Sequence, residues 1–432
     1  MIDGIIKDDF SSNLPIIVIN TDSKVIHDKS KTRGSMAIFG LNKNGRSSIS
    51  KKPTYNGNIE IKIRGASSKQ FPKKQYSIET KTLNWVDDDV SLLSMPKEHK
   101  WILYAPYSDK SLMRNYVAYE KTREINPKKY YAVRSKYVEL LIYNNGTYYY
   151  DGVYLLMEKI KRDKGRLNIK KLKLKQQNIT GGYIIKQDKK NEHEETLKFK
   201  ENKRFVYVYP KTKNITKAQK LYISTYLKDF QHALYSDDFN NSKSKNYYGR
   251  WINEESFIVH FISRELFLDV DSWDYSEFLH KDRDRKLSLS TVWDFNLGMG
   301  NNNYKFTGSF RKWGYLKMVN GEPYSINRWL ERLMSDKKFY NKVKGRWKSL
   351  RQTIYSEKEL SSFISKTKKR LKEASRRNFN RWDNVLGKKV WPNRRACREK
   401  GVNLYCKSFK SAVDEDMKEW LLHRARWMDK NF

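Results

Sequence analysis

Long hydrophobic runs are scarce in this sequence. Its longest apolar stretches, such as residues 14–19, have the length of a β-strand. No run of about 18 apolar residues is present, as a membrane-spanning helix would need. The opening segment MIDGIIKDDFSSNLP lacks a basic stretch followed by an apolar core. We therefore expect neither a transmembrane segment nor a signal peptide in the chain as given.

Cysteine is almost absent, since Cys397 and Cys406 are the only two. They lie in an Arg- and Lys-rich segment with no histidine nearby, which argues against a zinc site. A local disulfide would require an oxidising compartment, whereas two free thiols would require none. We favour the disulfide.

Acidic residues are outnumbered, because 88 Lys and Arg stand against 49 Asp and Glu and give a formal charge of +39. Such a charge attracts anionic polymers, acidic proteins, membrane surfaces and nucleic acid. The basic residues run along the whole chain, so a general composition bias explains the charge equally well. No nucleic-acid-binding module accompanies them, and we rank nucleic acid last as a specific partner.

Two common nucleotide-binding motifs are missing. The chain has neither GxGxxG nor GxxxxGK[ST], which excludes a Rossmann fingerprint and a P-loop at the level of motifs. Its 38% hydrophobic and 14% aromatic residues nevertheless suffice for a folded core.

The order of structural elements can be outlined from residue patterns. Short β-branched and aromatic runs fill residues 14–85, and residues 108–125 predict a helix capped by Ser108 or Asp109. Asn145-Gly146 predicts a hairpin turn between two strands. A further β-hairpin is expected around a polar turn at 281–286. Helical spacing dominates the second half, at residues 214–236, 252–268, 325–381 and 408–429.

Residues 61–79 read as a strand, a loop of small residues and a second strand. Backbone N–H groups of such a loop can surround phosphates while a strand lysine neutralises their charge. The alternative is an ordinary basic hairpin. The candidate residues are Arg64, Gly65, Ser67, Ser68, Lys73 and Lys74.

A second group of candidates surrounds the hairpin expected at 281–286. Asp271 and Asp294 are 23 positions apart and flank it, so the hairpin can bring both carboxylates to one end of a sheet. In phosphoryl transfer one carboxylate orients or deprotonates the acceptor hydroxyl and another holds magnesium. Ser276 occupies the place of the metal-binding Asn in a kinase catalytic loop, and Asn296 offers an amide oxygen beside Asp294. The alternative is that these acids cap turns and pair with nearby cations.

Five motifs in one order resemble those of the CotH kinase family, with similarity over roughly residues 12–310. The motifs are RGASSKQFPKKQYSIE, LLSMPKEHKWILYAPYSDKSLMRNYVAYE, NNGTYYYDGVYLLMEKIKRDKGRLNI, GGYIIKQDK and VWDFNLGMGN. The resemblance implies an α+β, atypical protein-kinase-like fold of two lobes. The β-rich lobe is expected at residues 12–190 and the mainly helical lobe at 191–432.

The resemblance also implies a reaction and its cofactors. The expected activity is transfer of the γ-phosphate of ATP to serine residues of proteins such as spore coat components, with Mg²⁺ or Mn²⁺. Kinase-like folds can transfer AMP instead, and the motifs do not distinguish the two. The charge predicts serine acceptors in neutral or acidic surroundings, or prior docking on an anionic surface. Asp269, Asp271 and Asp274 could instead make the acceptor side negative and admit a basic peptide.

Individual roles follow from the same resemblance. Asp271 matches the catalytic-loop aspartate, and Asp294 matches the metal-binding aspartate of the WDFD motif. Lys74, with Lys73 as a close rival, matches the phosphate-contacting lysine, and the phosphate-side loop contains Arg64, Ser67 and Ser68. The backbone around Glu158 is expected to face adenine. Glu120 matches the carboxylate that pairs with the lysine.

One departure from the family pattern concerns the metal ligands. This chain has WDFN where the family often has WDFD, so Asn296 replaces a charged ligand with a neutral one, which predicts weaker metal binding. An alternative function is therefore a weak or inactive CotH-like surface or adhesion protein that binds an anionic partner. The resemblance and the cysteine pair favour a location outside the cytoplasm or at the cell surface. The opening segment leaves a cytoplasmic location open.

Other notable side chains have simpler explanations. Trp273 and Trp293 are expected to pack in the core, and His260 and His280 to be structural. The run Asp87–Asp89 is expected to form a solvated turn, although three carboxylates could bind a cation.

Overall fold

The computed structural model describes residues 4–126, 130–188, 195–197, 205–269, 271, 273–304, 308–317 and 325–432. The chain divides into two compact units, each assembled from three separated segments. The first contains the residues up to Tyr116, then Arg134–Lys159 and Ser361–Lys418, and the second contains Val117–Val133, Ile160–Leu360 and Glu419–Phe432. The sequence had suggested one continuous segment for each lobe, with a boundary at residue 190.

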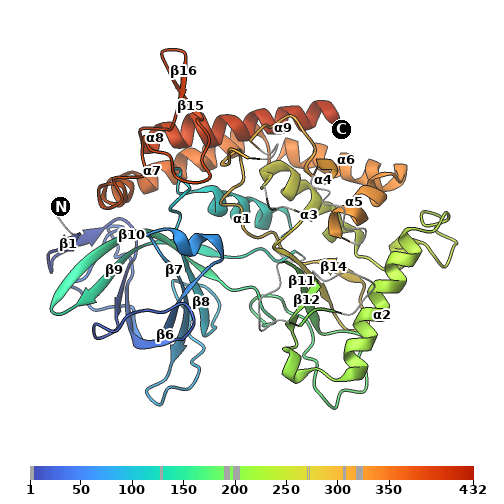
Figure 1. Ribbon diagram of the computed structural model, residues 1–432, viewed down its shortest axis with the longest axis horizontal. Helices are drawn as coiled ribbons and strands as arrows, with labels where there is room; N and C mark the ends of the chain where they lie inside the picture. Colours follow the sequence, from blue (N-terminus) through green and yellow to red (C-terminus); the bar gives the residue numbers. More distant parts are fainter. Residues whose placement is uncertain are drawn as a thin grey trace. The chain divides into compact units, whose positions relative to one another are not determined.

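The first unit is built on a closed sheet (Figure 1). Seven strands follow one another in the ring order β10-β8-β7-β6-β4-β3-β9, and β9 pairs again with β10. All of these pairings are antiparallel except that of β3 with β9. Closure leaves these seven strands without a free edge along the ring. The strands of this unit up to residue 158 are β1 (Ile5–Ile6), β2 (Ser11–Ser12), β3 (Ile16–Asn20), β4 (Thr32–Phe39), β5 (Ser47–Ser48), β6 (Tyr55–Arg64), β7 (Gln75–Lys81), β8 (Lys100–Tyr104), β9 (Ser135–Asn144) and β10 (Thr147–Glu158).

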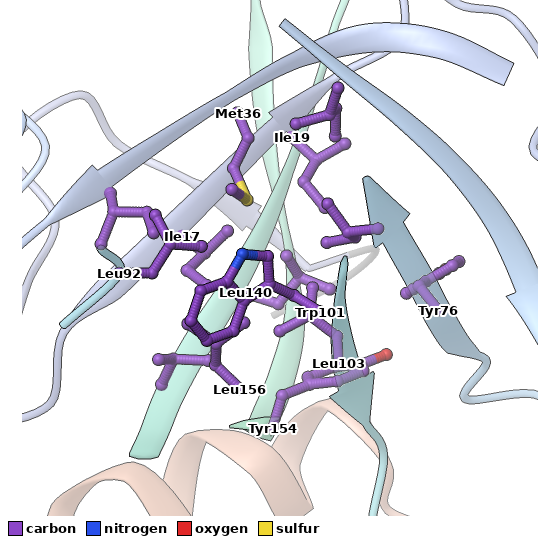
Figure 2. Packing of buried hydrophobic residues seen from close by; sticks show 14 of the residues in the cluster. Ile17, Ile19, Met36, Tyr76, Leu92, Trp101, Leu103, Leu140, Tyr154 and Leu156 are labelled. Carbon is purple, nitrogen blue, oxygen red and sulfur yellow. The ribbon is translucent and has the colours of Figure 1, made fainter. Parts of the chain in front are cut away.

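Alternating apolar residues fill the interior of this sheet. In β6, Ile59 and Ile61 are fully buried while the residues between and beside them are partly exposed. This period of two places every second side chain on the same face. Trp101 lies among these aliphatic side chains, as Figure 2 shows, with Leu140 and Leu156 beside it. The β-rich beginning expected from the sequence is confirmed.

The β9–β10 hairpin turns at Asn145-Gly146, as predicted. Both residues have positive φ, 46° and 78°, which is the conformation that a two-residue hairpin turn favours. The register of this pair then shifts between Tyr150 and Gly152. This irregularity brings the Gly152 backbone close to two side chains described below.

The helix predicted over 108–125 begins later, and α1 spans Arg114–Ile125. Asp109 accepts hydrogen bonds from the N–H groups of Ser111, at 3.0 Å, and Arg114, at 2.8 Å. A carboxylate that accepts from these N–H groups stabilises a turn before the helix. The predicted helix therefore exists, but its first six residues form this turn.

The rest of the first unit comes from its third segment. This segment contains most of α7 (Glu357–Arg381), the hairpin β15 (Cys397–Glu399) and β16 (Val402–Leu404), α8 (Phe409–Ser411) and the π-helix η4 (Ala412–Lys418). Cys397 and Cys406 form a disulfide at the base of the hairpin, as expected. In Figure 1 the β15–β16 hairpin projects away from α8.

The second unit combines a four-stranded sheet with most of the helices. The sheet has the order β12-β11-β13-β14, and all of its pairings are antiparallel. Its strands are β11 (Tyr183–Gln187), β12 (Phe205–Tyr209), β13 (Glu277–Lys281) and β14 (Leu287–Leu289). The hairpin expected around 281–286 is thus confirmed.

The helices of the second unit begin at recognisable caps. Thr216 forms a capping box with Gln219, Asn253 accepts from the N–H of Ser256, and Asp336 accepts from the N–H groups of Lys338 and Phe339. The helices are most of α1, α2 (Lys217–Leu234), α3 (Glu254–Phe267), α4 (Gly314–Lys317), α5 (Ile326–Met334), α6 (Lys337–Gln352), the start of α7 and α9 (Glu419–Asn431). Their positions agree with the predicted helical segments, except for the short helix α4, which was not predicted.

Membrane-spanning helices are not found in the described part of the chain. None of its helices is both long enough and apolar enough to cross a bilayer. This agrees with the sequence-based expectation.

Candidate functional site

Asp269 connects the two aspartate motifs of the second unit. It follows α3, and only 1% of its surface is exposed. One of its carboxylate oxygens accepts a hydrogen bond from the N–H of Asp271, at 2.8 Å, and the other accepts from the N–H of Leu297, at 3.0 Å. Because Leu297 directly follows Asp294-Phe295-Asn296, Asp269 ties the segment of Asp271 to the segment of Asp294.

Negative charge accumulates around Asp269. Burial, and then the carboxylates of Asp271 and Asp294, raise the pKa of Asp269 well above its ordinary value. Burial and the same acidic surroundings, here Asp271 and Asp269, also raise the pKa of Tyr304. Carboxylates gathered in a poorly solvated place favour a cation, and their hard oxygen atoms match the ligands that Mg²⁺ prefers. These side chains therefore offer the type of donor atom that the predicted metal prefers.

The backbone of these two segments is held in uncommon conformations. Trp273, Ser276, Asp294 and Met299 have positive φ values of 74°, 60°, 66° and 48°. Residues with a Cβ avoid this region unless the surrounding structure holds them there, and such residues cluster at active sites. The positive φ values of these two segments are therefore typical of a functional site, and this feature does not depend on their charges.

The Trp273 side chain holds the segment of Asp271 in place. Its side chain is fully buried, and its indole N–H donates to the Glu265 carboxylate at 3.0 Å. Glu265 also accepts from the N–H groups of Gly314 and Tyr315 and pairs with Arg424 at 2.8 Å. Trp273 is thus a packing residue, as expected, and Glu265 anchors it.

The two histidines singled out in the sequence are structural, as expected. His260 is fully buried and contacts the Tyr130 hydroxyl at 2.8 Å and the Glu277 carboxylate at 2.6 Å. His280 contacts the Ser290 hydroxyl at 2.9 Å, and burial lowers its pKa to about 4. Both imidazoles are therefore held by hydrogen bonds to neighbouring side chains.

Asp294 also depends on an aromatic residue of α1. Its N–H donates to the Tyr119 hydroxyl at 3.1 Å, and the Tyr119 ring stacks on Trp293 with 5.9 Å between centroids. The next residue, Glu120, pairs with Arg123 on the same helix. The proposed pairing of Glu120 with a lysine stays a prediction.

Ser276 and Asn296 have backbone contacts that fix their positions. The Ser276 carbonyl accepts from Arg264 at 3.1 Å, and the Asn296 carbonyl accepts from the Asn301 side chain at 2.8 Å. Their roles as a catalytic-loop residue and a metal ligand stay predictions.

The predicted phosphate loop lies at one end of the β6–β7 hairpin in the first unit. Gly65 has φ of 111°, a backbone conformation that residues with a Cβ rarely adopt, so the loop favours glycine at this position. Residues Ser67–Gln70 form the short helix η1. The Lys74 amine donates to the Lys69 carbonyl at 2.7 Å, and Arg64 donates to Gln75 at 3.3 Å. Lys74 therefore contacts the predicted loop directly.

Lys73 has a different environment from its neighbour. It is 1% exposed, and its amine donates to the Val153 carbonyl and to the Asn378 side chain, both at 2.7 Å. A Cβ at Gly152 would lie 2.9 Å from this amine, so glycine permits the close approach. Burial lowers the pKa of Lys73 to about 7. A buried, weakly charged lysine is a poor phosphate ligand, which favours Lys74 for that role.

The buried amine predicts a pH-dependent stability. Above pH 7 the folded state leaves Lys73 neutral while the unfolded chain still binds the proton, so stability rises with pH. For one titrating group the free energy of unfolding changes by at most about 1.4 kcal/mol per pH unit. We expect Lys73 to raise it by about 2 kcal/mol between pH 7 and 9. Urea unfolding of the wild type and of Lys73→Met measures this difference. An equal rise in both proteins would show that Lys73 is charged in the folded state.

The Glu158 side chain is structural. It is fully buried, and its two oxygens accept from the Arg134 guanidinium, at 2.8 Å, and from the Arg134 N–H, at 3.0 Å. Only its backbone was expected to face adenine, and that expectation stays a prediction.

Asp269 was not among the site residues that were predicted from the sequence. The alternation Asp269-x-Asp271 before an aromatic turn was the available signal, because two carboxylates two positions apart near a third form a potential cation site. Tyr119 was also omitted. A tyrosine within a helix gives no sequence signal that distinguishes it from a core residue.

These features define an α+β protein with a β-rich first unit, a carboxylate cluster in a largely helical second unit and a glycine-dependent basic loop. The sequence model of the family described as CotH kinase protein matches residues 61–428. The chain therefore belongs to this family. No curated protein matches it.

Proposed function

We propose that the protein is a kinase that transfers the γ-phosphate of ATP to serine hydroxyls of a protein substrate, with Mg²⁺ or Mn²⁺. The observation that carries this proposal is the position of Asp269, which holds the segments of Asp271 and Asp294 together through two backbone hydrogen bonds. Membership of the family supports it.

Each carboxylate has a distinct task in this proposal. Asp294 and Asp269 hold the divalent ion, which when bound neutralises charge on the phosphates. Asp271 accepts the proton of the serine hydroxyl. The serine oxygen forms a bond to the γ-phosphorus, the bond from that phosphorus to the bridging oxygen breaks, and ADP leaves. No covalent enzyme intermediate is needed, because phosphoryl transfer depends on positioning and charge stabilisation.

The first unit supplies phosphate contacts in the same proposal. Lys74 and the N–H groups of the loop beginning at Gly65 bind the phosphates, and Arg64 adds positive charge. The kinase-like two-lobed fold is part of this proposal. So are the adenine contact of the backbone around Glu158 and the metal contact of Asn296.

Parallel incubation with γ-labelled and α-labelled ATP tests the reaction. We expect γ-label, and no α-label, in protein of an extract from the source cells, and we expect the transfer to require a divalent ion. Incorporation of α-label instead would show AMP transfer. Incorporation of neither label with Mg²⁺ or Mn²⁺ would contradict an enzymatic function.

Asp271→Asn should separate binding from chemistry. The variant removes the proton acceptor but keeps the side-chain volume, so we expect nucleotide binding to persist and transfer to fall on the order of a hundredfold or more. Nucleotide titration and single-turnover transfer measure the two effects. Near-normal turnover would remove Asp271 from proton transfer.

A further inference from the structure

Asp89, Glu98 and His99, in the first unit, form a group of side chains with the right spacing to hold a metal ion. They lie in the long connection between β7 and β8, and one ligand atom from each lies within 4.8 Å of the others. The sequence had suggested only that the acidic run Asp87–Asp89 could bind a cation. The structure adds a histidine and a buried glutamate to that run.

Backbone pairing fixes these residues in place. Val90 and Glu98 exchange both backbone hydrogen bonds, at 3.2 and 3.1 Å, and Asp87 bridges to Lys81. The His99 carbonyl accepts from the N–H of Thr80 at 2.9 Å. Antiparallel pairing therefore positions the three side chains, and they do not depend on a free loop for their arrangement.

The imidazole of His99 has the surroundings of a metal ligand. Its Nδ1 lies 2.6 Å from an Asp89 oxygen and 3.1 Å from a Glu98 oxygen. Its Nε2 lies on the other side, 3.3 Å from an Asp87 oxygen. Imidazoles that bind metals commonly donate their second N–H to a carboxylate, which fixes the tautomer and the ring orientation. Asp87 is in position to do this.

Two lysines of this region pair with carboxylates outside the group of three. Lys81 lies 2.6 Å from Asp87 and 3.2 Å from Glu60, and Lys31 lies 2.8 Å from Glu60 and 2.6 Å from Glu79. Asp89 and Glu98 both face Nδ1 of the imidazole, so one ligand atom from each of the three side chains could reach a single cation.

The donor types indicate which cation. One imidazole nitrogen and two carboxylate oxygens form a mixed set, whereas Mg²⁺ and Ca²⁺ prefer oxygen ligands alone. Three protein ligands with water in the fourth position are a common arrangement for zinc. We propose that Asp89, Glu98 and His99 bind a zinc ion, that Asp87 orients the imidazole, and that the ion fastens the middle of the β7–β8 connection to the end that leads into β8.

This proposal is independent of the kinase activity, and its test uses the full chain. Isothermal titration with Zn²⁺ should show one ion per chain, and Co²⁺ should give visible absorption typical of a site with a nitrogen ligand. The Asp89 side chain is 64% exposed, so Asp89→Asn should fold normally. We expect Asp89→Asn and His99→Gln to weaken Zn²⁺ binding about a hundredfold or more, and Asp87→Asn to weaken it about tenfold to a hundredfold.

Two controls make the outcome decisive. Asp88→Asn removes the same charge from the adjacent position without removing a proposed ligand, and Asp294→Asn alters the proposed ATP-associated cation site. Both should retain the Zn²⁺ affinity of the wild type. Absence of stoichiometric binding to the wild type would overturn the proposal. So would wild-type affinity in Asp89→Asn, or a loss confined to Asp294→Asn.

Discussion

Asp294→Asn is expected to abolish the magnesium-dependent part of the stabilisation by ATP and to reduce phosphate transfer on the order of a thousandfold. A ligand that binds only the folded protein stabilises it by mass action, by about 2.7 kcal/mol at a hundred times its Kd. If Asp294 is a metal ligand, its loss removes the metal-dependent part of that effect and the charge stabilisation of transfer together.

Thermal unfolding with ATP and Mg²⁺, each alone and combined, measures the first effect. A suitable control is Asp237→Asn, because Asp237 is an exposed aspartate in the same unit. The control should keep the combined shift. An unchanged shift in Asp294→Asn would remove this residue from the metal site.

Arg424→Ala is expected to cause the largest loss of stability, about 3–5 kcal/mol. Arg424 is fully buried on α9, lies 2.8 Å from Glu265 and donates to the carbonyls of Phe310 and Lys312 at 2.9 and 2.7 Å. Its removal leaves the buried Glu265 carboxylate without its cation. Because Glu265 also anchors Trp273, the segment of Asp271 should lose its support at the same time.

Arg426→Ala provides a matched control on the same helix. Arg426 pairs with Glu357, but its side chain is 51% exposed, so its removal should cost less than about 1 kcal/mol. Urea unfolding compares the two variants, and transfer measured below the unfolding transition tests the effect on the Asp271 segment. Equal, small losses in both variants would show that the buried pair contributes little.

Local patterns predicted the β-rich beginning and most helices. The Asn145-Gly146 turn and the helices after residue 214 depend on turn chemistry and apolar spacing within short segments, which the sequence displays directly. The start of α1 was predicted six residues early, because the Asp109 side chain satisfies backbone donors in a turn that resembles a helix cap in sequence. The three-segment units could not be predicted, since they depend on contacts between distant segments.

The candidate site was predictable where motifs carried the signal. Asp271 and Asp294 flank a hairpin that the sequence indicates, and the structure joins their segments through Asp269. The distinction between Lys73 and Lys74 needed the structure, because adjacent lysines look equivalent in sequence while burial makes them different. The buried partner of Trp273 on α3, Glu265, and the partner of Glu265 on α9, Arg424, were likewise invisible to local patterns.

The central claim is that this protein transfers the γ-phosphate of ATP through a site containing Asp294. Its most direct test is mass spectrometry of protein acceptors after incubation with ATP and Mg²⁺ or Mn²⁺, with wild type and Asp294→Asn side by side. We expect phosphoserine with the wild type and essentially none with the variant. Unmodified acceptors with the wild type under every metal condition, or equal phosphorylation by both proteins, would contradict the claim.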